Sequence, residues 1–284
     1  MNVSRIGVVG AGQMGAGIAQ VAAMAGIRVA MQDVSDAALQ RGSDAIATSL
    51  EKLVRREKMT ALDAEAARAR VEVSTDVGVF NAADFVIEAA AEDEALKRAI
   101  FSRLDAITPP HAILASNTSS ISITRLGSAT QRPGAVIGMH FMNPVPLMPL
   151  VELIRGMATT DATSDATRAL ASTMGKTVIV AEDRPGFAVN RILMPMINEA
   201  FYALQEGVAS KEDIDAGMKL GTNQPMGPLT LGDFIGLDTC LSIMRVLHDG
   251  LGDSKYRPCP LLVSYVDAGW YGRKSGRGVY EYRR

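Results

Sequence analysis

Short apolar runs alternate with longer amphipathic stretches over the first 180 residues of the chain. The lengths of these runs and their nearly continuous apolar character predict strands that are covered on both faces. The stretches between them have the length and spacing of helices, and such alternation predicts the α/β class, with a doubly wound, mainly parallel sheet. The predicted strands are Ile6–Val9, Arg28–Gln32, Asp84–Glu88, Ala112–Ala115, Ala135–Met139, Leu150–Ile154 and Thr177–Val180, and the predicted helices are Met14–Ala25, Asp36–Lys58, Asp93–Ile107 and Thr163–Met174.

The pattern changes near Pro185-Gly186. Residues 187 to about 267 have a helical pattern and contain no further apolar run of strand length. Ser210 followed by Asp213 predicts the start of one short helix, and Gly221 predicts its end. A Pro-Gly pair between two such regimes is typical of a domain boundary. We therefore expect an α/β domain over residues 1–183 and a smaller, all-helical domain over residues 184–284.

Composition narrows the classes of partner. The chain has 284 residues, of which 48% are hydrophobic and 21% are charged, and 29 basic residues against 31 acidic ones give a net charge of −2. This balance argues against a nucleic-acid or membrane-surface partner. Two distant cysteines, Cys240 and Cys259, argue against a disulfide framework, and three histidines leave little room for a metal site. We expect no metal and a cytoplasmic location.

The segment Ile6–Ile27 has no charged residue and superficially resembles a signal peptide or a membrane span. This run of 22 residues contains six glycines and the polar residues Gln13 and Gln20. We therefore interpret it as buried protein.

A dinucleotide fingerprint, G-x-G-x-x-G, occupies the first turn from strand to helix. It consists of Gly10, Ala11, Gly12, Gln13, Met14 and Gly15, and Asp33 follows 21 residues after Gly12 at the end of the next strand. The glycines permit a tight turn, close approach of the pyrophosphate and close helix packing, and the helix N-terminus offers free N–H groups to phosphates. Asp33 would accept hydrogen bonds from ribose hydroxyls and repel a 2′-phosphate, which favours NAD over NADP. This context makes the predicted sheet Rossmann-like, although flavin binding or a nucleotide-free tight turn would share the motif.

A dehydrogenase that acts on an alcohol needs a base for the hydroxyl proton, and histidine is the natural candidate near neutral pH. His111 follows two prolines on a turn, and His248 lies at a predicted helix C-terminus. His140 directly follows a predicted strand, where ligands bind in open α/β folds. By elimination, His140 is the candidate base.

Glu152 lies inside the apolar run Leu150–Ile154, where a charge is costly unless it is paired. A hydrogen bond to His140 would fix the ring's tautomer and stabilise the imidazolium. The alternative is an exposed residue on an edge strand. The polar run Ser116–Ser120 also follows a predicted strand, and it either caps the next helix or presents hydroxyl groups to a substrate.

Taken together, these motifs resemble the L-3-hydroxyacyl-CoA dehydrogenases, and within them the short bacterial 3-hydroxybutyryl-CoA dehydrogenases, essentially from end to end. The resemblance is carried by the residues 10–17, 86–89, 115–120, 138–146, 151–154, 185–191, 218–221, 225–228 and 272–276. Met142 and Gln224 depart from the usual family pattern, and we expect them to alter packing only.

The resemblance implies NAD as cofactor, an acyl-CoA substrate and a homodimer formed through the helical domain. It implies that His140 and Glu152 form the catalytic pair, that Ser119 and Asn190 bind the substrate's oxygens near C3, and that Glu92, Lys97, Asn143 and Lys274 contact NAD. It further implies that Lys58 and Arg56, in the basic run Arg55–Lys58, bind the phosphates of coenzyme A. The alternative for this run is a solvated helix end whose cations favour the helix dipole.

Several other functions remain open. The family's shared catalytic core fits a 3-hydroxyadipyl-CoA dehydrogenase as well as a 3-hydroxybutyryl-CoA dehydrogenase. A non-catalytic NAD-binding protein and a dehydrogenase for free hydroxy acids are further alternatives. A serine hydrolase built on Ser119, His140 and Glu152 is disfavoured, because the serine lacks a G-x-S-x-G turn.

Overall fold

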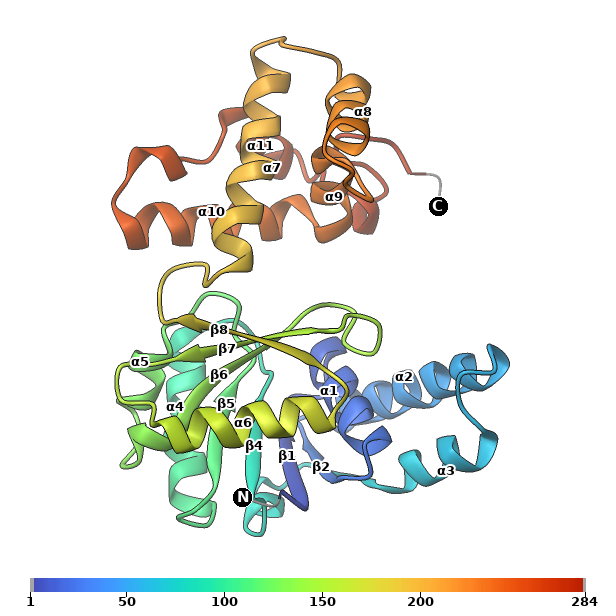
Figure 1. The fold of residues 1–284 in the computed structure, drawn as a ribbon, viewed down its shortest axis with the longest axis vertical. Helices are drawn as coiled ribbons and strands as arrows, with labels where there is room; N and C mark the ends of the chain where they lie inside the picture. The colour runs from blue at the N-terminus through green and yellow to red at the C-terminus, as the bar shows by residue number, and fades with distance from the viewer. Residues whose placement is uncertain (1–2, 283–284) are drawn as a thin grey trace. The chain divides into compact units, whose positions relative to one another are not determined.

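The structure, a computed structural model, describes residues 3–282 and divides the chain into two compact units, residues 1–184 and 185–284 (Figure 1). The first unit is built on one eight-stranded sheet with the strand order β3-β2-β1-β4-β5-β6-β7-β8. Every neighbouring pair is parallel except β6 and β7. The strands are β1 (Arg5–Val9), β2 (Arg28–Gln32), β3 (Val71–Ser74), β4 (Phe85–Glu88), β5 (Ile113–Ser116), β6 (Val136–Phe141), β7 (Leu150–Arg155) and β8 (Thr177–Glu182).

Helices cover both faces of this sheet. Residues of α1, α2 and α6 join the strands in one apolar core, which includes Ile18, Ile46 and Leu170, and α6 is seen crossing the sheet in Figure 1. Phe101 and Leu104 of α4 are fully buried outside that core cluster, and α4 contacts β5. The helices of this unit are α1 (Gln13–Met24), α2 (Asp36–Arg55), α3 (Ala61–Ala69), α4 (Glu94–Ile107), α5 (Ile123–Gly127) and α6 (Asp161–Thr173).

The second unit is helical and has a separate apolar core, which includes Ile197, Phe201 and Leu241. Its helices are α7 (Val189–Gln205), α8 (Lys211–Gly221), α9 (Pro228–Ile235), α10 (Leu237–Leu251) and α11 (Pro260–Asp267). The C-terminal segment is held by Asp233 on α9, whose carboxylate accepts hydrogen bonds from the backbone N–H groups of Val279 and Tyr280 at 2.9 Å. Burial dominates the environment of Asp233 and raises the pKa of its carboxyl group.

The fold class predicted from the sequence is confirmed, and all seven predicted strands are present. Ser210 caps α8 as predicted, since its side chain accepts a hydrogen bond from the Asp213 N–H, and Gly221 is the last residue of that helix. The prediction missed β3, α3 and α5, and it ended α2 three residues too late. Within residues 3–282, no helix is long and apolar enough to cross a membrane.

Candidate active site

Each glycine of the fingerprint is required for a different structural reason. Gly10 adopts a φ of +95°, and a Cβ on Gly15 would lie 1.8 Å from the Gly10 carbonyl oxygen, so neither position accommodates a side chain. A Cβ on Gly12 would meet no protein atom within 4 Å. The space above Gly12 is therefore open at the N-terminus of α1, as the phosphates of a dinucleotide require. These residues fit NAD.

Asp33 lies directly after β2 and contacts the fingerprint loop. One of its carboxylate oxygens accepts a hydrogen bond from the Ala11 N–H at 2.9 Å, and the other accepts one from the Ser35 N–H at 3.1 Å. Asp33 thus helps to hold the loop in addition to the ribose contact that its position predicts. Asn143 reaches the same loop, because its Oδ1 accepts a hydrogen bond from the Gln13 side chain at 3.1 Å.

His140 and Glu152 are direct cross-strand neighbours in the antiparallel pair of β6 and β7. The imidazole Nδ1 lies 2.8 Å from Glu152 Oε2, His140 is 8% exposed, and Glu152 has no exposed surface. The alternative of an exposed glutamate on an edge strand is wrong, because β7 lies between β6 and β8. His140 belongs to β6 itself, whereas the sequence placed it just after the strand.

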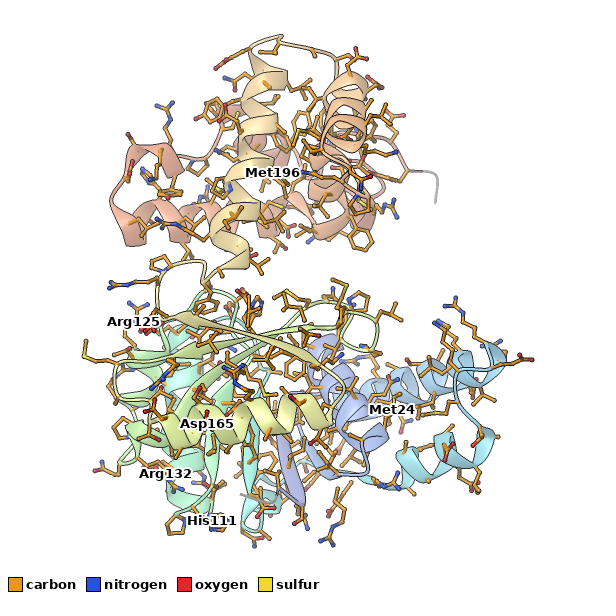
Figure 2. The ribbon with its side chains drawn as sticks, viewed as in Figure 1. Met24, His111, Arg125, Arg132, Asp165 and Met196 are labelled. Carbon is orange, nitrogen blue, oxygen red and sulfur yellow. The ribbon has the colours of Figure 1, made fainter. Side chains whose placement is uncertain are left out.

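The other two histidines lie in different surroundings. His111 is exposed at the edge of the sheet where the strands begin, and its ring lies 3.5 Å from Asp84 (Figure 2). His248 is on the last turn of α10 in the second unit. Among the described residues, His140 is thus the histidine that is buried against a carboxylate.

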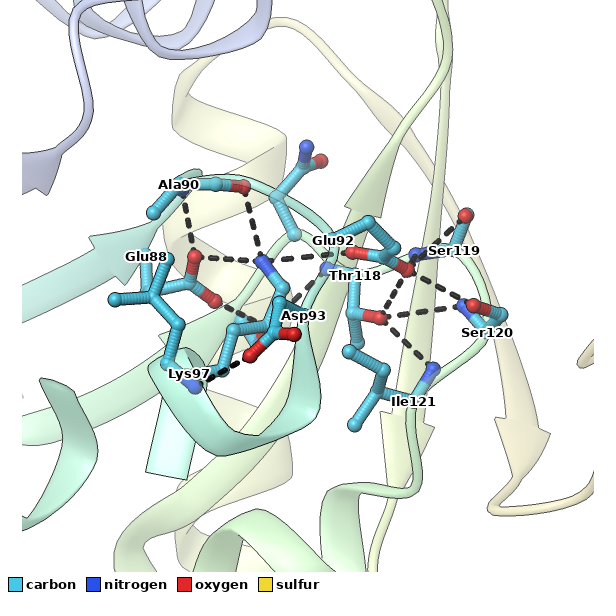
Figure 3. Close-up of polar contacts among 12 residues, drawn as sticks. Glu88, Ala90, Glu92, Asp93, Lys97, Thr118, Ser119, Ser120 and Ile121 are labelled. Atoms are coloured by element: carbon cyan, nitrogen blue, oxygen red, sulfur yellow. Dashed lines mark hydrogen bonds and ion pairs between the residues drawn. The ribbon is translucent and has the colours of Figure 1, made fainter. Parts of the chain in front are cut away.

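The hydroxyl run after β5 surrounds Glu92 (Figure 3). Oε1 of Glu92 accepts hydrogen bonds from Thr118 Oγ1 at 2.6 Å, Ser119 N at 2.9 Å, Ser120 Oγ at 3.0 Å and Ser119 Oγ at 3.2 Å. The helix that follows is capped by Ser122, so the run from Ser116 to Ser120 does not cap it. Burial alone would raise the pKa of Glu92, but the charge of Lys97 and these hydrogen bonds outweigh burial and lower that pKa.

A buried ion pair lies beneath Glu92. Lys97 is 1% exposed, and its Nζ lies 2.6 Å from Glu88 Oε1, 3.2 Å from the Ala90 carbonyl oxygen and 3.5 Å from Glu92 Oε2. Glu88 has no exposed surface, and its other carboxylate oxygen accepts a hydrogen bond from Ser116 Oγ at 2.6 Å. Buried charges require this degree of pairing. The pair joins the ends of β4 and β5 to α4.

Sequence reasoning gave no role to Asn117, which connects three strand ends. Its backbone N–H donates to the Glu88 carbonyl oxygen at 2.7 Å, and its Oδ1 accepts from the Phe141 N–H at 2.9 Å. The loop that carries Ser119 is therefore fixed to β4 and to the residue after His140. A polar residue directly after a buried strand was the available signal for Asn117, whereas its partners depend on the strand order.

The proposed coenzyme A residues lie at the far end of α2 from Asp33. That helix has 20 residues and is about 30 Å long. Arg56 and Lys58 are exposed at the connection from α2 to α3. A groove with a volume of about 540 Å³ lies between these two helices, and Arg55 lines it whereas Arg56 and Lys58 do not.

Two predicted site residues belong to the second unit. Asn190 is in the first turn of α7 and is 8% exposed. Lys274 lies near the C-terminal end of the chain, and its Nζ is 2.6 Å from the Asp238 carboxylate.

The first unit is Rossmann-like and has an open dinucleotide loop. A histidine–carboxylate pair is buried near the carboxyl ends of its parallel strands. These two features define the class of nucleotide-dependent dehydrogenases. Comparison with known proteins agrees. Residues 5–184 match the family model of the 3-hydroxyacyl-CoA dehydrogenase NAD binding domain, and residues 186–282 match that of the 3-hydroxyacyl-CoA dehydrogenase C-terminal domain.

Individual relatives cover almost the whole chain. A 3-hydroxybutyryl-CoA dehydrogenase of Bradyrhizobium diazoefficiens is 58% identical over 99% of this chain and 96% of its own length. One of Mycobacterium tuberculosis is 44% identical over 99% of both chains. The structure is also similar to the crystal structure of (S)-3-hydroxybutyryl-CoA dehydrogenase from Ralstonia eutropha, with a TM-score of 0.97 over 100% of both chains. The sequences of the two chains are 53% identical.

The chain therefore belongs to the 3-hydroxyacyl-CoA dehydrogenase family. It is an enzyme of that family, and NAD is its cofactor. The resemblance predicted from the sequence motifs is confirmed.

Proposed function

We propose that this enzyme catalyses the reversible oxidation of a short-chain (S)-3-hydroxyacyl-CoA, namely 3-hydroxybutyryl-CoA, to the corresponding 3-oxoacyl-CoA. The relatives that are similar over the full chain support this choice of substrate. The observation that carries the chemistry is the 2.8 Å contact between His140 Nδ1 and Glu152 Oε2.

The contact with Glu152 determines which nitrogen of His140 acts as the base. A carboxylate only accepts hydrogen bonds, so the ring proton is on Nδ1 and the lone pair is on Nε2. Nε2 takes the proton of the substrate's 3-hydroxyl group, and Glu152 stabilises the resulting imidazolium. A dinucleotide held at the fingerprint loop would supply the acceptor for the hydride on C3. In the reverse direction, the imidazolium returns the proton to the forming alkoxide.

Ser119 and Asn190 hold the C3 oxygen, and this orientation contributes to the rate. Lys58 and Arg56 bind the phosphates of coenzyme A, which favour cationic partners. Glu92, Lys97, Asn143 and Lys274 serve the cofactor. The enzyme acts as a homodimer through its helical unit and is located in the cytoplasm.

The activity is tested by NADH absorbance in the presence of acetoacetyl-CoA. We expect loss of NADH that depends on acetoacetyl-CoA, and its absence with short and medium 3-oxoacyl-CoA substrates would contradict the proposal. His140→Ala should lower kcat by about a hundredfold or more with nearly unchanged NADH affinity. His111→Ala, at the opposite edge of the sheet, is the control and should leave kcat unchanged.

A second candidate substrate comes from a longer relative. The 3-hydroxyadipyl-CoA dehydrogenase of Escherichia coli is 41% identical over 100% of this chain and 60% of its own length. A comparison of kcat/KM for 3-hydroxybutyryl-CoA and 3-hydroxyadipyl-CoA decides between them. A higher value for the dicarboxylic substrate would assign this enzyme the second activity.

A further inference from the structure

Lys176, the residue before β8, is buried without an ion-pair partner among the described residues. It is 9% exposed, and its Nζ donates hydrogen bonds to the backbone carbonyl oxygens of Val145 at 2.6 Å and Met148 at 2.9 Å. Burial lowers the pKa of its ammonium group. Burying a cation without an opposite charge is costly. The two contacts with carbonyl oxygens therefore indicate what this lysine does.

Lys176 lies at the edge of the sheet that carries the candidate site. Strands β7 and β8 are parallel to each other and antiparallel to β6, so they begin at the edge where β6 and its parallel neighbours end. The two carbonyl groups belong to residues 142–149, which connect β6 to β7. The Thr177 N–H donates to the Pro149 carbonyl oxygen at 2.8 Å, so two adjacent residues hold this connection.

The same connection contacts the dinucleotide loop. A Cβ on Gly17 would lie 2.9 Å from Val145 Cβ, so the lack of a side chain at Gly17 lets the connection pack closely against α1. Asn143 Oδ1 accepts a hydrogen bond from the side chain of Gln13, the first residue of α1. Within residues 3–282, the amide N–H₂ group of Asn143 donates to no protein atom. This group is therefore a hydrogen-bond donor that a ligand at the fingerprint loop can use.

We propose that Lys176 is a positioning residue for the cofactor: it holds the connection from β6 to β7 and so keeps Asn143 beside the fingerprint loop. The inference rests on the proposed contact between Asn143 and NAD. The chemistry of His140 and Glu152 should not depend on Lys176, because the hydrogen bonds of β6 and β7 set the spacing of that pair. Loss of Lys176 should thus affect binding of the cofactor and leave turnover nearly unchanged.

The test uses Lys176→Met, which keeps a long side chain but removes the ammonium group. The affinity of the full-length enzyme for NADH, measured by fluorescence, should weaken about three- to tenfold, as loss of one hydrogen bond to the cofactor predicts. At saturating NADH, kcat with acetoacetyl-CoA should stay within about twofold. Unchanged NADH affinity, or an equal loss of affinity and kcat, would overturn the role. The titration needs no acyl-CoA, so it stands even if the proposed substrate is wrong.

A second variant and a matched control keep the test decisive. Lys176→Gln has a shorter amide that can donate to at most one of the two carbonyl groups, and it should also weaken NADH binding. Arg132 is a cation of the same unit that donates to the backbone carbonyl oxygens of Asp105 and Thr108, directly before the segment that leads into β6 (Figure 2). Arg132→Met should leave the NADH affinity unchanged, and an equal loss in this control would contradict the inference.

Asn143→Ala separates this inference from the proposed contact with NAD. It should weaken NADH binding about three- to tenfold, and adding Lys176→Met should weaken it no further, because Lys176 acts through Asn143. Additive losses in the double variant would overturn the inference. If Asn143→Ala weakens NADH binding but neither Lys176 variant does, the role of Lys176 is overturned and the Asn143 contact stands. If Asn143→Ala leaves the affinity unchanged, the proposed contact fails, and the inference fails with it.

Discussion

Glu152 and Glu88 are carboxylates with no exposed surface, and each has a nitrogen partner within 2.8 Å. Burying a carboxylate is costly unless it is paired and hydrogen-bonded, so the fold must have a use for each of them. Glu152 contacts the candidate base, and Glu88 contacts the lysine that faces Glu92.

Replacing Glu152 with Gln tests its role at the scale of one side chain. The amide keeps the shape of the side chain but loses the charge that stabilises the imidazolium, so we expect kcat to fall about a hundredfold. The affinity for NADH, measured by its fluorescence, should stay within about twofold. A variant with nearly normal kcat would show that His140 acts without its neighbour.

Asp33→Asn separates the charge of Asp33 from its contact with the fingerprint loop. The amide oxygen can still accept the hydrogen bond from the Ala11 N–H, which holds the fingerprint loop. The hydrogen bond from the Ser35 N–H and the negative charge that repels a 2′-phosphate are lost. We expect the kcat/KM ratio of NADPH to NADH to rise about tenfold or more. Asp36→Asn, at the exposed start of α2, is the matched control, and an unchanged preference in Asp33→Asn would exclude Asp33 as the selector.

At the scale of elements, two glycines in the turn from β1 to α1 have different roles: one is required for folding and the other for cofactor binding. Ala at Gly15 would place its Cβ 1.8 Å from the Gly10 oxygen, whereas Ala at Gly12 would meet no protein atom within 4 Å. Gly15→Ala should therefore lower the free energy of unfolding by about 1–3 kcal/mol or more, measured with urea. Gly12→Ala should change it by less than about 0.5 kcal/mol.

The affinity for NADH should depend on Gly12 even though the stability does not. Gly12→Ala should weaken NADH binding about tenfold or more, because its methyl group occupies the space that the phosphates need. Equal loss of stability in both variants, or full NADH affinity in Gly12→Ala, would contradict this account of the loop.

The strands that the sequence predicted are mostly apolar runs, and the short strands β4 and β5 among them are buried at every residue. The missed strand β3 has four half-exposed or exposed residues at the edge of the sheet, and α3 buries Ala67 alone, so neither gives a strong periodic signal. The antiparallel direction of β7 follows from the sequence, because the ten residues between the predicted strands Ala135–Met139 and Leu150–Ile154 are too few for a parallel crossover.

In the candidate site, too, some residues could be predicted from local sequence signals and others could not. His140 and Glu152 follow from an apolar run and an isolated charge, which are local signals. The contacts of Glu88, Lys97 and Asn117 bring together the ends of β4, β5 and β6. They depend on the strand order, and one sequence does not reveal that order without the resemblance to a family.

At the scale of the whole molecule, each unit has its own core, and the second unit exposes large apolar side chains. Ile192 is 74% exposed and Leu220 is 86% exposed. Single exposed apolar side chains are common on protein surfaces, and the proposed dimer predicts that a partner chain covers these two.

Light scattering after gel filtration tests this dimer. We expect a mass of about 60 kDa, twice that of the 30.1 kDa chain. Leu220→Asp should shift the enzyme toward the monomer at low protein concentration. Leu62→Asp is the matched control, at a leucine of the first unit that is 76% exposed. A monomeric wild-type enzyme would contradict the proposal.

The pairing of β6 with β7 also bears on how relatives of this enzyme can diverge. Since the sheet's own hydrogen bonds set the spacing of His140 and Glu152, the connecting residues 142–149 do not have to maintain it. Apart from Asn143, which contacts the fingerprint loop, natural selection can alter the sequence of this connection without displacing the acid–base pair. New substrate preferences can therefore arise around chemistry that is inherited unchanged.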